Sequence, residues 1–211
     1  MTGKIIVIEG TDSSGKETQT KLLEKSLQKE GIKCVHFAFP MYDTPTGRII
    51  GGDYLGKEEF GESLFAEGTR NVDPKVVCLY YAADRKYNWS KIEDFLKQGY
   101  IVILDRYTTS NLAHQGSKLN TQEERFNMYQ WIDKLEYWLL QLPKPDKTIF
   151  LHVPYEYSLK TKSVEEQKRA EEAYIELSEL YNWDRVECVK EGKLRSVEDI
   201  HKEILDIVKE V

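Results

Sequence analysis

The fold class is decided by residues 6 to 27, IVIEGTDSSGKETQTKLLEKSL. An apolar run ends at Gly10, four residues follow, and Gly15 and Lys16 open an amphipathic segment. Glycines allow the backbone to turn its amides toward a phosphate, and the following helix adds its positive N-terminus. Lys16 can then reach the β- and γ-phosphates of a nucleotide. The position between an apolar strand and a helix favours a phosphate-binding loop over an ordinary strand–helix turn.

Position 17 departs from the usual pattern of such a loop. The residue after the lysine is normally Ser or Thr, which holds magnesium, but here it is Glu17. A carboxylate near a triphosphate is repelled by about 1 kcal/mol in water, and by about 4 kcal/mol when partly desolvated. We therefore expect Glu17 to lie near Mg²⁺ or its water shell. The alternative is an outward-facing acid of the first helical turn, stabilised by the helix dipole.

The hydrophobic pattern predicts a three-layer α/β/α fold of the P-loop type, with a central parallel sheet of about five strands. Nearly continuous, β-branched runs are typical of strands buried on both faces. The strong runs are residues 4–10, 100–106 and 147–154, and weaker ones, expected nearer the edges, are 33–40 and 184–190. The predicted helices are residues 16–30, 73–97, 121–141, 156–182 and 196–210.

Length and composition indicate a single domain over residues 1–211. The chain is 40% hydrophobic and 31% charged, as in ordinary globular proteins. A net charge of −6 argues against general binding to nucleic acid duplexes. No apolar run approaches the roughly 20 residues that cross a bilayer. The N-terminus has the pattern of a strand rather than a signal peptide, and the three cysteines are expected to be reduced packing residues, so we predict a cytoplasmic protein.

Further motifs follow the predicted strands, at the edge where open α/β sheets bind ligands. Asp105 ends the run YIVIL, where P-loop enzymes place the acid that holds magnesium, usually through water. The alternative for Asp105 is a helix N-cap. Arg106 beside it can clamp a phosphoryl group through two hydrogen bonds, which favours the catalytic interpretation.

Four motifs occur in order along nearly the whole chain. They are GTDSSGKETQ at 10–19, FP at 39–40 followed by TPTG up to residue 47, LYYAADR at 79–85 and DRYTTSNLAHQ at 105–115. Together they resemble the thymidylate kinase family: its phosphate loop with an internal acid, its acceptor-nucleotide loop, its base-reading helix and its DRY signature. The resemblance implies an enzyme that transfers the γ-phosphoryl group of ATP to dTMP with Mg²⁺ as cofactor.

The resemblance also implies roles for single residues near the phosphates. Asp12 would accept from the sugar 3′-hydroxyl of the acceptor and help to orient Arg106, which bridges the donor and acceptor phosphates. The expected catalytic residues are Lys16, Arg106 and Asp12. The expected ATP-phosphate contacts are Gly10, Thr11, Asp12, Ser13, Ser14, Gly15, Lys16, Glu17 and Thr18. The expected metal ligands are Asp105 and Glu17.

An acceptor pocket is implied in the same way. Tyr81 would stack on the thymine, Arg85 would donate to a base carbonyl, and Asn111 would share the base edge. Core packing for Tyr81 and a surface ion pair for Arg85 are the alternatives. The expected dTMP contacts are Asp12, Phe39, Pro40, Tyr42, Tyr81, Arg85, Arg106, Ser110, Asn111, His114 and Gln115.

Three positions depart from the family pattern. Tyr42 stands where members often carry an arginine for the acceptor phosphate. His114 stands where an aromatic residue commonly lies near the deoxyribose, so discrimination against ribonucleotides is left open. His152 replaces an acid that is common at the end of the fourth main strand, and it is interpreted as structural.

The lid, about residues 155–172, carries few cations. The family supplies a catalytic arginine either in the phosphate loop, which has none here, or from a basic lid. Lysine lacks the planar fork of arginine, and the charges fit a solvated helix face equally well. The lid cations expected to contribute are Lys160, Lys162, Lys168 and Arg169.

Two other functions stay open at this point: a kinase for another deoxynucleoside monophosphate, and a catalytically impaired nucleotide-binding protein, for which Glu17 and the thin lid argue. The predicted partners are small nucleotides, with no nucleic acid or membrane, and by family analogy a second copy of the chain as a homodimer.

Overall fold

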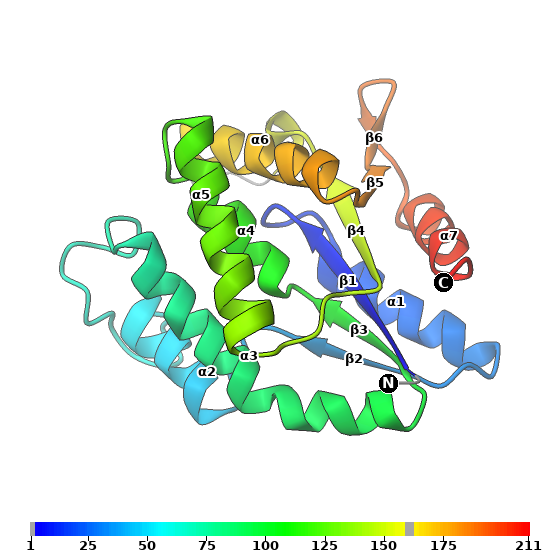
Figure 1. Ribbon diagram of the computed structural model, residues 1–211. Coiled ribbons are helices and arrows are strands. Elements are labelled where there is room, and N and C mark those ends of the chain that lie inside the picture. Colours follow the sequence, from blue (N-terminus) through cyan, green and yellow to red (C-terminus); the bar gives the residue numbers. More distant parts are fainter. Residues whose placement is uncertain (1–2, 159–162) are drawn as a thin grey trace. The chain divides into compact units, whose positions relative to one another are not determined.

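The computed structural model describes residues 3–158 and 163–211 (Figure 1). The chain forms two compact units. Unit 1 comprises residues 1–37, 93–106 and 144–211, and unit 2 comprises residues 38–92 and 107–143. The single domain over residues 1–211 stays a prediction. Within the described ranges, no helix is both long enough and apolar enough to span a membrane.

The central sheet has five strands in the order β2-β3-β1-β4-β5. The strands are β1 Lys4–Gly10, β2 Cys34–Ala38, β3 Ile101–Asp105, β4 Lys147–His152 and β5 Asp184–Glu187. Strand β1 pairs in parallel with both β3 and β4, and β4 pairs in parallel with β5. The predicted parallel sheet is confirmed, and the two weaker runs occupy its edges as expected (Figure 1).

Both faces of the sheet are covered within unit 1, which explains the continuous apolar runs. On one face, Ile6 and Ile8 of β1 share a buried cluster with helix α1 (Lys16–Lys29) and helix α7 (Val197–Val208). On the other face, Phe150 of β4 stacks on Tyr174 of helix α6 (Val164–Leu180), with ring centroids 5.2 Å apart. Each fully buried aliphatic side chain contributes about 1.5–3 kcal/mol.

Helix ends in unit 1 are set by local signals. Ser163 and Glu166 form a reciprocal capping box at the start of α6, and Ser196 caps α7. Helix α6 therefore begins at Val164, and the prediction of a helix from residue 156 was wrong there. Residues Tyr155–Tyr157 form a short 3-10 turn, η3, instead. A small hairpin of β6 (Val189–Lys190) and β7 (Lys193–Leu194) was not predicted.

Unit 2 is mainly helical. It contains α2 (Pro45–Ile49), the π-helical turn η1 (Ile50–Tyr54), α4 (Thr108–Gly116), α5 (Gln122–Asp133) and the π-helical turn η2 (Lys134–Leu139). Helix α3 (Pro74–Lys97) has its residues 74–92 in this unit. The predicted helices at 73–97 and 121–141 correspond to α3 and to α5 with η2, whereas α2, η1 and α4 were not predicted.

Candidate active site

The loop between β1 and α1 has the backbone of an anion-binding turn. Gly15 adopts a left-handed conformation (φ 87°) directly before α1, and no side chain caps the helix there. The amides of the first helical turn are therefore available to a phosphate. At Gly10 a Cβ atom would lie 2.5 Å from Ser14 Oγ and 2.9 Å from the Leu151 carbonyl oxygen, so only glycine fits.

Lys16 is buried and its amine is held over the loop. Nζ donates to the carbonyl oxygen of Thr11 at 2.7 Å and to Ser14 Oγ at 3.3 Å. Burial lowers the pKa of Lys16 to about 8, and the nearby Arg106 acts in the same direction, against the opposing field of Asp105 and other acids. The amine thus contacts loop oxygens rather than the apolar core, which fits the predicted phosphate role.

Arg106 and Asp12 form an ion pair although they lie 94 residues apart in sequence. Arg106 Nη2 donates to Asp12 Oδ1 at 2.7 Å. Burial alone would lower the pKa of Arg106, but Tyr174, Asp12 and other acids outweigh it and raise the pKa. Arg106 also adopts a left-handed backbone (φ 69°), which costs a non-glycine residue about 1–3 kcal/mol and occurs often at functional sites.

Two carboxylates stand at neighbouring strand ends. Burial raises the pKa of Asp105, against the opposing effect of Lys16 and Arg106. Glu9 on β1 is fully buried and accepts a hydrogen bond from Tyr174 Oη at 3.0 Å. Glu9 is absent from the predicted site. The signal that identifies it is a lone charge inside an apolar strand, directly before the loop glycine.

Glu17 has the geometry of the outward alternative. Its side chain is 76% exposed and pairs with Lys21 at 2.5 Å, one helical turn along α1. The hydrogen bond from Lys21 lowers the pKa of Glu17. A metal role would require the carboxylate to leave this pair. Thr18 is exposed, and Ser13 is exposed with φ 63°.

In unit 2, Arg85 is fully buried and is paired with a buried acid. Its Nε donates to Glu136 Oε2 at 2.8 Å, and its Nη2 forms a short contact with Glu136 Oε1. Asn111 Nδ2 donates to the same Oε1 at 3.0 Å. The alternative of an ion pair for Arg85 is thus partly met, but the pair lies in the interior rather than on the surface. Glu136 was not predicted.

The acceptor-loop residues contact a second buried acid of unit 2, Asp84 on α3. Asp84 accepts from the Met41 amide at 3.0 Å, from Thr46 Oγ1 at 2.7 Å and from Asn88 Nδ2 at 2.9 Å. These contacts hold residues 41–46, directly after the predicted Phe39 and Pro40. Phe39 is buried, and its ring lies 6.2 Å from that of Tyr107.

Tyr42 and Tyr81 both pack against aromatic neighbours. Tyr42 stacks on Phe60, and Lys57 Nζ lies 3.8 Å from the centre of the Tyr42 ring. A lysine is thus close to the position where the family often has arginine. Tyr81 meets Tyr54 edge to face at 6.2 Å and packs against the cluster of Ile50, Tyr54, Val72 and Val77, but it is only half-buried and keeps part of its surface accessible.

The remaining acceptor residues lie together on α4. Ser110, Asn111 and Gln115 are buried and His114 is half-buried. Gln115 Oε1 is buried and has no hydrogen-bond partner in the described part of the chain. The structure thus groups the predicted phosphate residues in unit 1 and the predicted base residues in unit 2. The roles of both groups stay predictions.

The predicted lid cations are only partly described. Lys160 and Lys162 lie outside the described residues. Lys168 is exposed, and Arg169 Nε donates to Glu165 at 3.1 Å along the same helix. This ion pair fits the alternative of a solvated helix face.

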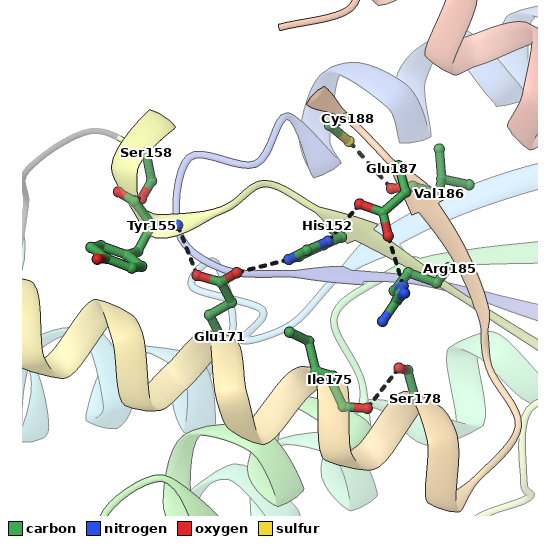
Figure 2. A network of polar contacts seen from close by, with 10 residues as sticks. All are labelled: His152, Tyr155, Ser158, Glu171, Ile175, Ser178, Arg185, Val186, Glu187 and Cys188. Atoms are coloured by element: carbon green, nitrogen blue, oxygen red, sulfur yellow. Dashed lines mark hydrogen bonds and ion pairs between the residues drawn. The ribbon is translucent and has the colours of Figure 1, made fainter. Parts of the chain in front are cut away.

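His152 lies at the end of β4 between two acids (Figure 2). Its Nε2 contacts Glu171 at 2.8 Å and its Nδ1 contacts Glu187 at 2.6 Å, while Glu171 also accepts from the Tyr155 amide. The hydrogen bond to Glu171 raises the pKa of His152 against the effect of burial, and Glu187 adds to the rise. These contacts tie α6 and β5 to β4, which fits a structural role.

Known proteins match this chain over most of its length. A sequence model of the family "Thymidylate kinase" matches residues 8–210. Thymidylate kinase from Plasmodium falciparum is 31% identical over 99% of this chain and 90% of its own length. The Schizosaccharomyces pombe thymidylate kinase is 29% identical over 99% of this chain and 93% of its own. A solved structure of Candida albicans thymidylate kinase superposes with a TM-score of 0.71 at 26% identity, covering 99% of this chain and 92% of that one. The chain belongs to the thymidylate kinase family.

Proposed function

We propose that the protein transfers the γ-phosphoryl group of ATP to dTMP, giving dTDP and ADP. The observation that carries the proposal is the Asp12–Arg106 ion pair, which occurs together with a buried Lys16 in a chain of the thymidylate kinase family. Both cations are held by oxygen atoms of the protein, and cations fixed in this way can stabilise phosphate charge with little reorganisation.

Each phosphate-side residue has a chemical task. Lys16, held by the Thr11 carbonyl oxygen, neutralises the β- and γ-phosphates. Arg106 has a planar fork that can contact two phosphoryl oxygens at once and stabilise charge on the transferring group. Asp12 orients that fork and accepts from the sugar hydroxyl of the acceptor.

Mg²⁺ is the proposed cofactor, and the donor chemistry fits it. Magnesium prefers oxygen ligands, keeps several waters and is usually held by one or two carboxylates together with substrate phosphates. Asp105 is a carboxylate at the end of β3, and its charge acts to raise the pKa of Lys16. Across residues 3–158 and 163–211, no group of three or more His, Cys, Asp or Glu side chains could hold a metal. We assign the ion to Asp105, through water, and to the phosphates of ATP; when bound it would neutralise phosphate charge.

The predicted acceptor residues of unit 2 suit a thymine-like base. Tyr81 supplies an aromatic face, and Arg85 and Asn111 supply hydrogen-bonding groups on adjacent helices of unit 2. By family analogy the protein is a homodimer in the cytoplasm.

The test is ADP production from ATP and Mg²⁺ with a panel of nucleoside monophosphates. We expect dTMP to exceed AMP and dGMP at least tenfold in kcat/KM, about 1.4 kcal/mol. Equal turnover of dGMP would refute the base-pocket assignment. No ADP with any acceptor would favour the impaired nucleotide-binding protein. The panel includes dUMP and dCMP because the Candida albicans relative was described as having broad substrate specificity.

A further inference from the structure

Glu136 is the most deeply buried acid of unit 2, and it contacts two residues predicted to read the base. Its carboxylate has no exposed surface and lies in the π-helical turn η2. Such turns are rare and occur often at functional sites. Glu136 receives Arg85 from α3 and Asn111 from α4, so three elements meet at one carboxylate.

Stability alone is a weak reason to bury this ion pair. Arg85 and Glu136 have 2% and 0% of their side-chain surfaces exposed. Removing two charges from water costs several kcal/mol per ion, and apolar side chains of similar volume are often equally stabilising. A buried pair of this kind is better explained by what it orients.

The hydrogen bonds to Glu136 determine which atoms of Arg85 and Asn111 remain available to a ligand. An ionised carboxylate only accepts hydrogen bonds, so the amide of Asn111 must turn Nδ2 toward Glu136 and keep Oδ1 on its other side. Arg85 only donates, and three of its five N–H groups are used by Glu136 and by the carbonyl oxygen of Tyr107. Asn111 and Arg85 together therefore offer a ligand one acceptor, Asn111 Oδ1, and the remaining N–H donors of Arg85.

We infer that Glu136 is a positioning residue that sets base selectivity by fixing this donor and acceptor order. The inference rests on the proposed function. Thymine presents an N3–H donor beside the O4 acceptor, which matches Asn111 Oδ1 and an Arg85 N–H. Cytosine presents an N3 acceptor beside an N4 amino donor, so it sets acceptor against acceptor and donor against donor. Unmatched buried polar groups are costly, so such a site rejects the wrong base strongly.

The test compares dTMP with 5-methyl-dCMP, because both carry the 5-methyl group and they differ only at N3 and at the substituent on C4. Binding of each is measured by calorimetry, and kcat and KM by ADP production. The wild-type protein is expected to favour dTMP at least 100-fold. In Glu136→Gln the amide at position 136 can donate, so Asn111 can turn over; the preference should fall at least tenfold, mainly through KM for dTMP.

The control is Glu123→Gln, an exposed acid of α5, which should leave the preference unchanged. A preference in Glu136→Gln within twofold of wild type would overturn the inference, even if both affinities fall together. If circular dichroism shows that Glu136→Gln is unfolded, Glu136→Asp is the deciding variant. It keeps the negative charge but shortens the side chain, so the preference for dTMP should fall at least threefold. An unchanged preference in Glu136→Asp would overturn the inference. A wild-type protein that does not use dTMP at all would refute the proposed function, and this inference with it.

Discussion

The two groups of candidate residues hold their charges in different ways. In unit 1, Asp12 and Arg106 keep 36% and 23% of their side-chain surfaces exposed, and Lys16 donates to two loop oxygens. In unit 2 the Arg85–Glu136 pair is sealed from water. A phosphate brings its own strong charge and needs cations that can still approach it. A neutral base brings weak dipoles, and these are distinguished only where water does not compete and where donors and acceptors cannot turn.

The largest effect should come from unit 1. Lys16→Ala is expected to lower kcat at least about 1,000-fold, roughly 4 kcal/mol, because a fixed cation on the transferring phosphates is lost. The fold should be kept, since the amine of Lys16 contacts loop oxygens rather than the apolar core. ADP production and thermal melting are the measurements, and Lys21→Ala, on the exposed face of α1, is the matched control. Wild-type turnover in Lys16→Ala would refute the phosphate-loop assignment.

A pH series measures the free-energy cost of burying the charged amine of Lys16. Its pKa is about 8 in the folded protein and near 10.5 when unfolded, so the unfolded chain binds more protons between these values. The stability of the wild type relative to Lys16→Met should therefore rise as pH increases from 8 to 10.5, by up to about 3 kcal/mol. Urea unfolding of both proteins across this range gives the difference, and taking the difference removes the titration of the cysteines and tyrosines. A stability difference that does not change with pH would show that burial of the charged Lys16 has no such cost. Bound ATP should reduce the rise in stability with pH.

Asp84 probes the acceptor loop of unit 2. Asp84→Ala leaves the Met41 amide and Thr46 without their acceptor, so the free energy of unfolding should fall by about 2 kcal/mol. If residues 41–46 serve the acceptor, KM for dTMP should rise several-fold while KM for ATP stays within twofold. Asp94→Ala, an exposed position on α3, is the control. Equal changes in both KM values would contradict a specific role in acceptor binding.

The smallest effect is expected at Glu17. Its carboxylate is exposed and paired with Lys21, so Glu17→Gln and Glu17→Thr should change the apparent Mg²⁺ requirement less than twofold. Titration of Mg²⁺ at fixed ATP is the measurement. A shift above fivefold in either variant would instead restore Glu17 as a ligand of the ion or of its water shell.

Several features followed from the sequence because their causes are local. Strands covered on both faces must be apolar at nearly every position, so the apolar runs at β1, β3 and β4 could be recognised in the sequence. Gly10 and Asp105 are recognisable because each ends such a strand, and Gly15 and Lys16 because they stand where the next helix begins. Helix α4 escaped prediction for the opposite reason: all its residues except His114 are buried, so it has no polar face to give a helical period.

Only the tertiary structure decided the partners of the charges. Glu9 meets Tyr174 across 165 residues, Asp12 meets Arg106 across 94, and Arg85 meets Glu136 across 51. Residue type indicates that a buried charge needs a partner, but many acids in the chain qualify equally. The partner is selected by which strands pair, how helices pack on the sheet and where turns such as η2 place a side chain, and all of these depend on the whole core. The sequence by itself therefore determined the sheet and the glycine- and lysine-containing loop after β1. The pairing of strands and the packing of helices that lie far apart in the sequence determined which acid each buried cation meets.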